Sequence, residues 1–275
     1  MIEALTQLFS YQFMQNAFLA GSAAAVLGGV VGYFVVLRGE AFAGHSLSVV
    51  AFPGAAGAVL FGLPQLMGLA TLCTVSGLGI GFLGRTRLRD QRAEAAAIAT
   101  IQAFMLALGF LFVSLYRGLL EGVNNILFGT FLGITRGQVW VLIAVTLVVL
   151  ALLTVIGRPL LYLSVDEAAA AAARVPVRLL SLGFLVVLGL AIAGTALITG
   201  ALLVFALLVM PAAAANQLLT RPGQAMILAT GLGLLTVWTS LIASYFSDLP
   251  IGFLVTAVGL LFYVLARLGG HLRLT

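Results

Sequence analysis

The chain has 275 residues, of which 63% are hydrophobic and only 8% are charged, and its mean hydropathy is +1.22. Soluble globular proteins carry about 25% charged residues, so this composition excludes a soluble fold and leaves no stretch for a soluble ATPase, protease or kinase domain. The net charge of +5 comes entirely from arginine, and we attribute it to membrane topology rather than to nucleic-acid binding.

Apolar stretches of roughly 18–22 residues recur along the whole chain, and each is long enough to cross a hydrocarbon core of about 30 Å. We therefore expect a single all-α, polytopic membrane domain over residues 1–275 with about nine transmembrane helices. The second and seventh spans each contain proline and glycine, which leaves open whether they are broken or partly re-entrant. The expected spans are 15–37, 43–62, 64–84, 94–115, 137–157, 179–197, 199–217, 224–246 and 251–267.

The distribution of arginine predicts the orientation, because cytoplasmic loops carry the excess of basic residues. With the N-terminus outside and the C-terminus in the cytoplasm, only Arg117 and Arg136 lie on the outer side. The other arginines lie at inner helix ends and loops, including the basic loop at 84–94, which we expect to contact lipid headgroups. This asymmetry favours an odd number of spans.

His45 is the first polar side chain of interest, because polar groups inside a membrane are costly and mark pathways. It lies just inside the second span, with Ser46 and Ser48 beside it. A neutral imidazole is a good ligand for zinc and an adequate one for manganese. His45 is therefore a candidate contact for a transported metal, and Ser48, one helical turn on, is a second. The alternative is a histidine near the cytoplasmic interface that bonds a backbone carbonyl.

Residues 164–177 predict a short cytoplasmic helix between the fifth and sixth spans. Ser164 or Asp166 can cap its N-terminus, Glu167 suits its first turn, and an alanine run favours the helix. Arg174 falls in its last turn. A capped helix on a chain without a nucleotide site indicates a docking surface for a partner, although a plain connector remains the alternative. The residues that we expect to take part in this docking are Asp166, Glu167, Ala170 and Arg174.

The span at 199–217 carries Pro211 among small residues. Proline in a helix interior removes a backbone donor and costs about 3 kcal/mol. Lipid offers no partner for the carbonyl that loses its hydrogen bond, so neighbouring helices must approach closely enough to satisfy it. We therefore expect this helix to be bent, to lie inside a bundle and to line a transport path.

Six segments in this order resemble a known family of membrane proteins. Together they are similar to the membrane subunit of metal-uptake ABC transporters, the zinc/manganese/iron permease family. The segments are RGEAFAGHSLSVVAFPGAAGA (38–58), AIATIQAFMLALGFLFVSL (97–115), NNILFGTFLGI (124–134), SVDEAAAAAARVPVRLL (164–180), GALLVFALLVMPAAAA (200–215) and SYFSDLPIGFLVTAVGLLFYV (244–264).

The resemblance implies an ABC importer permease in the bacterial cytoplasmic (inner) membrane, with two copies paired around a translocation path. It also implies a cytoplasmic ATP-binding subunit that receives the helix at 164–177, and an extracytoplasmic metal-binding protein. This chain would then bind no cofactor and carry no enzymatic activity of its own. We expect the cargo to be a divalent transition metal, zinc first and manganese second. Where the family commonly has a second histidine, this chain has Val49.

A secondary transporter or channel that works alone is the competing interpretation. Such a protein needs an ionisable group inside the membrane to couple protons or sodium, and His45 near one end of its span is the only candidate. A structural membrane scaffold is a third possibility, against which the proline-containing helix and the cytoplasmic helix both argue.

Overall fold

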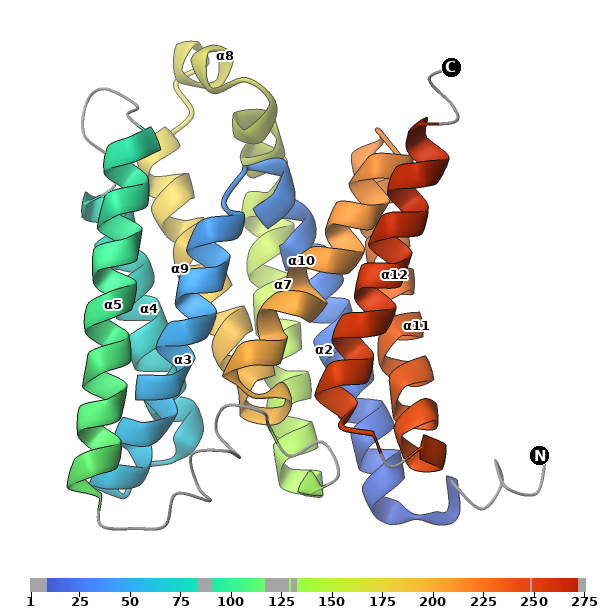
Figure 1. Ribbon diagram of the computed structural model, residues 1–275. Coiled ribbons are helices and arrows are strands. Elements are labelled where there is room, and N and C mark those ends of the chain that lie inside the picture. The colour runs from blue at the N-terminus through green and yellow to red at the C-terminus, as the bar shows by residue number, and fades with distance from the viewer. Residues whose placement is uncertain (1–8, 84–90, 117–128, 130–132, 248, 272–275) are drawn as a thin grey trace.

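The computed structural model describes residues 9–83, 91–116, 129, 133–247 and 249–271. Within these ranges the protein is a bundle of ten helices (Figure 1). The helices are α2 (Gln12–Leu37), α3 (Ala41–Phe61), α4 (Gln65–Leu83), α5 (Gln91–Leu115), α7 (Arg136–Val165), α8 (Glu167–Ala172), α9 (Val177–Thr199), α10 (Ala201–Leu218), α11 (Pro222–Ser247) and α12 (Ile251–His271).

The expected all-helical membrane fold is confirmed. Eight of the described helices are long and apolar enough to cross a membrane, and α10 is a shorter apolar helix. Each of the nine expected spans coincides with one of these helices. The two spans with proline, α3 and α10, are each one continuous helix through Pro53 and Pro211. The start of α2 lies at one end of the bundle, whereas α8 and the end of α12 lie at the other (Figure 1), as an odd number of crossings requires.

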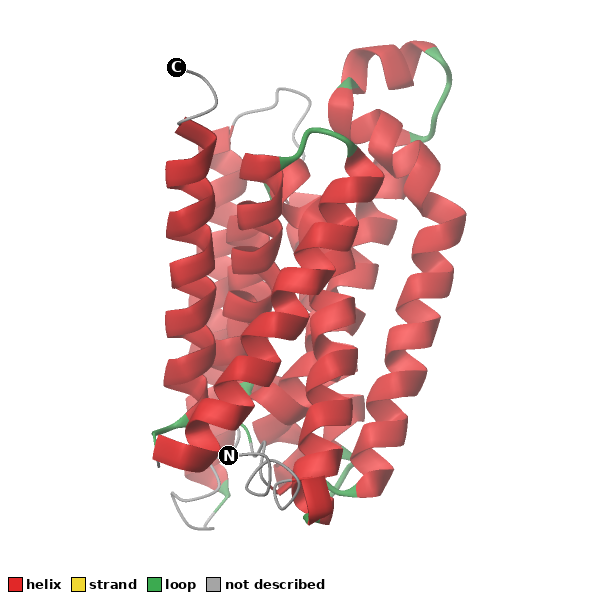
Figure 2. Cartoon of the chain, turned by 90° about the vertical axis from the view of Figure 1, so that its right-hand side faces the viewer, coloured by secondary structure: helices red, strands yellow, loops and turns green. Residues whose placement is uncertain are grey.

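Three helices form the middle of the bundle between two outer groups, which also meet directly where α3 contacts α10. α2, α7 and α9 pack on one another; α3, α4 and α5 lie on one side of them, and α10, α11 and α12 on the other (Figure 1). Most of α9 is buried inside the bundle, whereas most of α5 is exposed on its outside, so α9 belongs to the core and α5 to the periphery. Figure 2 shows the helices running lengthwise side by side, with α8 at one end.

Glycines allow two pairs of helices to approach to backbone contact. A Cβ atom at Gly32 of α2 would overlap the carbonyl oxygen of Leu208 in α10, and one at Gly68 of α4 would overlap the carbonyl oxygen of Gly54 in α3. Apolar lipid gives helices little hydrophobic reason to associate, so close packing between small residues is a main source of attraction. These contacts fix α10 against α2 and α3 against α4.

Helix α7 is longer than a bilayer core needs. Its 30 residues correspond to about 45 Å at 1.5 Å per residue, whereas a hydrocarbon core is about 30 Å thick. A capping box fixes its start, because Thr135 accepts from the backbone N–H of Gln138 while the Gln138 side chain accepts from the backbone N–H of Thr135. Its far end carries α8 at the end of the bundle (Figure 1).

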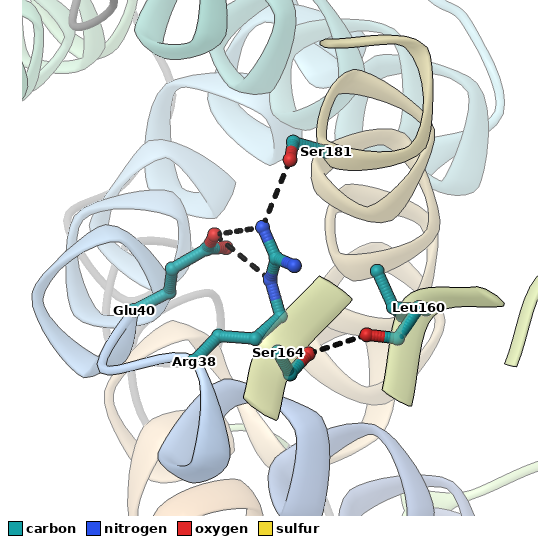
Figure 3. Close-up of polar contacts among 5 residues, drawn as sticks. All are labelled: Arg38, Glu40, Leu160, Ser164 and Ser181. Atoms are coloured by element: carbon teal, nitrogen blue, oxygen red, sulfur yellow. Dashed lines mark hydrogen bonds and ion pairs between the residues drawn. The ribbon is translucent and has the colours of Figure 1, made fainter. Parts of the chain in front are cut away.

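The short helix expected at 164–177 begins later than predicted. Ser164 belongs to the end of α7, where its hydroxyl donates to the carbonyl of Leu160 at 2.6 Å (Figure 3), so it does not cap α8. The cap is Asp166, whose Oδ1 accepts from the backbone N–H of Ala169 at 2.8 Å. Of the two candidate caps, the structure therefore assigns Asp166.

The same helix also ends earlier than expected, so the predicted range of 164–177 is too long. The prediction that Arg174 lies in the last helical turn is wrong, because α8 ends at Ala172 and Arg174 has a φ of +59°. The backbone N–H of Val175 donates to the carbonyl of Ala170 at 3.0 Å, which closes the helix C-terminus around this left-handed residue in the manner of a Schellman motif.

Candidate functional site

His45 lies in the second turn of α3, at the end of the bundle where α2 turns into α3. Its ring is partly exposed, and its edge meets the ring of Phe205 in α10 with centroids 5.0 Å apart and planes at 71°. The buried Nδ1 atom has no hydrogen-bond partner among the described residues. Among the described residues no backbone carbonyl bonds Nδ1, so a carbonyl bond of His45 would have to use Nε2. Because Nδ1 is enclosed by the protein, a ligand can reach His45 only at the exposed part of its ring.

One face of α3 is open although the helix is otherwise packed. His45 and Val49, four residues apart, are partly exposed, whereas Ser46, Leu47 and Val50 between and beyond them have no exposed surface. Residues four apart on a helix lie on the same face. Val49, at the position where the resemblance leads us to expect a second histidine, therefore lies on the open face beside His45 and carries an aliphatic side chain.

Helix α10 has a matching open face. Phe205, Val209 and Ala213, spaced by four residues, are each partly exposed, whereas Val204 and Leu208 beside them are buried. Since α10 packs against α3 and Phe205 touches His45, the two open faces meet at this contact. Pro211 itself is buried, which agrees with the expectation that this helix lies inside the bundle.

Ser48 does not join His45 in this arrangement. It is 2% exposed, and its hydroxyl donates to the carbonyl of Gly44 at 2.9 Å, so the proton is already used within the helix. Among the described residues, no group of three or more histidine, cysteine or acidic side chains is placed to hold a metal ion. What this part of the chain offers is one imidazole on an open helix face, which can contact a passing ion but cannot chelate it.

The open face of α10 gives a prediction about water access. In a background with Cys73 replaced by alanine, cysteines at 205, 209 and 213 should react with a water-soluble thiol reagent, because these positions are partly exposed. Cysteines at 204, 208 and 212 should be protected, because the native side chains there are at most 2% exposed. Labelling is measured by gel shift in intact membranes. Equal protection of both sets, or labelling only by lipid-soluble reagents, would place this face against lipid.

The exposed face of α8 differs from the one expected. Ala170 has no exposed surface and packs with Leu163 of α7 and Leu180 of α9, so the prediction that it faces a docking partner is wrong. Within α8 the exposed alanines are Ala168, Ala171 and Ala172, spaced as i, i+3 and i+4, and Ala173 directly after the helix is exposed as well. Two further expected coupling residues, Glu167 and Arg174, are exposed and flank this face. We define Ala168, Ala171 and Ala172 as the outer face of α8.

Two features of this region had no counterpart in the sequence-based predictions. Phe205 contacts His45 although 160 positions separate them in the sequence, so only the fold brings them together. Arg38 and Glu40 form an ion pair at the start of α3. The sequence does contain a signal for this pair: Arg38, Gly39 and Glu40 are consecutive between two long apolar spans, where two opposite charges so close together are unusual.

The chain is similar in sequence and in fold to known membrane transport proteins. Residues 10–269 match the ABC 3 transport family. The manganese transport system membrane protein MntC of Halalkalibacterium halodurans is 28% identical over 260 residues, 94% of this chain and 88% of that protein. The manganese import system permease protein ScaB of Streptococcus parasanguinis is 26% identical over 264 residues, 96% and 93% of the two chains. A solved structure of PsaBC from Streptococcus pneumoniae in complex with Fab has a TM-score of 0.85 at 24% identity, covering 97% of this chain and 95% of that one.

Proposed function

The chain belongs to the ABC 3 transport family, and we propose that it is the membrane-spanning permease of an importer that carries a divalent transition metal, manganese before zinc. The observation that carries the proposal is the family match over residues 10–269, which includes every span, the open faces at His45 and Phe205, and α8. The sequence alone puts zinc first, but the names of the MntC and ScaB relatives support manganese over zinc.

The proposed path runs where the open faces of α3 and α10 meet. Manganese prefers oxygen ligands and water, and imidazole is only an adequate ligand for it. A single His45 therefore suits a partly hydrated ion in transit, with backbone carbonyls and water completing its shell. Conduction requires a site weak enough to release what it admits. In this scheme the capture affinity resides in a separate extracytoplasmic metal-binding protein, and pairing of two copies of this chain adds a second His45.

The energy for import comes, in this proposal, from ATP hydrolysed by a cytoplasmic subunit that docks on the outer face of α8. The exposed alanines present an apolar surface with few rotamers to order, flanked by the charged side chains of Glu167 and Arg174. The competing function, a transporter that works alone, lacks support in the described part of the chain, because no carboxylate there lies in the interior of a span.

The experiment that tests the proposal measures metal uptake by proteoliposomes holding this chain, its ATPase subunit and its binding protein. We expect ATP-dependent uptake of manganese that zinc inhibits. Replacing His45 by alanine should slow uptake about tenfold, the effect of losing one contact worth about 1.4 kcal/mol, with little change in protein level. Val49→His should increase metal retention in the path, because it adds an imidazole on the same helix face.

The controls separate transport from folding. Val49→Ala changes the same position without adding a ligand and should leave the uptake rate close to that of the wild type. If His45→Ala lowers the amount of protein while uptake per molecule stays unchanged, the histidine is structural. If the wild-type chain supports no ATP-dependent uptake of manganese, zinc or iron, the proposed function is wrong.

A further inference from the structure

A buried ion pair lies at the corner where α2 turns into α3 (Figure 3). Arg38 ends α2, Gly39 has a φ of +68°, and Glu40 precedes the first residue of α3. The Nε and Nη2 atoms of Arg38 both donate to Oε1 of Glu40, at 3.0 and 2.7 Å. The two side chains are only 7% and 15% exposed. An arginine that served only as a topology signal would extend its guanidinium to water or headgroups, and this one does not.

The same guanidinium is also held by α9. Its Nη2 atom donates to the hydroxyl of Ser181 at 3.1 Å (Figure 3), and its Cζ atom lies 5.2 Å from the centre of the Phe184 ring. Both α9 residues are buried, and Phe184 packs in turn against Phe34 of α2. Charge-assisted hydrogen bonds and a cation–π contact therefore bind the α2–α3 corner to one face of α9.

The α9 residue next to this contact packs against α8. Leu180 precedes Ser181 and forms a small apolar cluster with Ala170 of α8 and Leu163 of α7. Ala170 adjoins Ala171 on the outer face of α8, and it packs with Leu180 of α9. The next residue of α9 is Ser181, whose hydroxyl accepts from Arg38. A force applied to α8 reaches Arg38 through packed side chains, with no loop in between.

On the other side of the pair, Glu40 sets the start of α3. Its carbonyl accepts from the backbone N–H of Gly44 at 3.0 Å, which forms the first turn of the helix, and His45 is the next residue. Hydrogen bonds fix the backbone of this corner, because the N–H groups of Arg38, Gly39 and Glu40 all donate to carbonyls in the last turn of α2. The position of Glu40 therefore determines where the imidazole of His45 lies.

We propose that Arg38 and Glu40 are positioning residues that make His45 follow the movements of α9, so that α8 controls the metal path through them; this role rests on the proposed function. Desolvation offsets much of the attraction in a buried ion pair, so such a pair contributes little net stability. The planar fork of arginine instead specifies one geometry. The pair thus connects α9, which packs against the proposed docking helix α8, with the start of α3, which carries His45. An ATP-driven importer has to couple these two parts.

The test replaces Arg38 by methionine, which keeps an unbranched side chain of comparable length and removes the charge and all donors. In proteoliposomes with the ATPase subunit and binding protein, we expect ATP hydrolysis to persist while the ratio of manganese ions transported to ATP hydrolysed falls about five- to tenfold, the usual size of a coupling effect. Arg38→Lys keeps the charge without the fork and should show an intermediate ratio. Ser181→Ala removes one hydrogen bond and should show the smallest loss.

A second measurement is independent of the cargo. Spin labels at the exposed positions Phe42 of α3 and Leu179 of α9 report whether the two helices stay in register. We expect a narrow distance distribution in the wild type and a broad one in Arg38→Met. Equal widths, or a fall in hydrolysis and transport in the same proportion, would overturn the positioning role. Failure of the wild type to transport metal, with the difference in widths retained, would instead count against the proposed function alone.

Discussion

Replacing Gly32 by alanine should remove nearly all folded protein from the membrane. The added Cβ atom would overlap the Leu208 carbonyl oxygen, lie 2.8 Å from its carbonyl carbon and lie 3.3 Å from the Cβ of Ala212. Most of these atoms belong to the backbone of α10, so no rotamer change relieves the clash. Overpacking costs about 1–3 kcal/mol and occasionally more, and α2 cannot move away because it also packs against α7, α9 and α11.

The measurement is the amount of monodisperse protein in detergent, together with its melting temperature. Gly183→Ala and Gly231→Ala are matched controls, because both lie inside helices and a Cβ at either position meets nothing within 4 Å. The controls should be at least as stable as the wild type, since alanine favours a helix over glycine by up to about 1 kcal/mol. A Gly32→Ala protein that melts at the wild-type temperature would show that α2 and α10 are not in backbone contact.

Placing a charge on the outer face of α8 should disconnect the permease from its ATPase. In Ala171→Asp, docking would bury a carboxylate without a partner in the interface, and such a group costs several kcal/mol. We expect binding of the ATPase subunit to weaken about a hundredfold, which corresponds to about 2.7 kcal/mol, with transport lost and the permease itself intact. Co-purification and uptake measure the two effects.

Neighbouring alanines provide the contrast. Ala171→Ser is small and uncharged and should keep ATPase binding. Ala170→Asp, at a position that the sequence alone places among the coupling residues, should instead lower protein stability, because Ala170 is buried against Leu163 and Leu180. Normal binding and transport by Ala171→Asp would refute docking on this face.

The sequence predicted the helices well and their contacts poorly, for a physical reason. Spans follow from composition because lipid requires long apolar helices with satisfied backbones, and the Asp166 cap follows from local hydrogen bonding. The buried member of an alanine run cannot be found in this way, because Ala170 and Ala171 are chemically identical and only the positions of Leu163 and Leu180 distinguish them.

The same limit applies to the candidate site. The imidazole of His45 was recognisable from the sequence as a polar group at the edge of a span, and in the structure it lies partly exposed on the open face of α3. Its aromatic neighbour Phe205 and the contact of Arg38 with Ser181, 143 positions away, depend on how α9 and α10 cross the bundle. Hydropathy carries no information about such crossings, because every apolar span offers several faces of similar composition.

The surplus length of α7 has a consequence for the proposed docking of an ATPase subunit on α8. If its first turns sit in the outer interface, the last part of the helix extends about 10–15 Å beyond the hydrocarbon core, given the lengths of the helix and of the core. In the proposed orientation, this overhang would hold α8 beyond the lipid headgroups. A soluble partner could then bind α8 without contacting the bilayer. A small tilt of α7 within the membrane would also produce a larger lateral displacement at the end that carries α8.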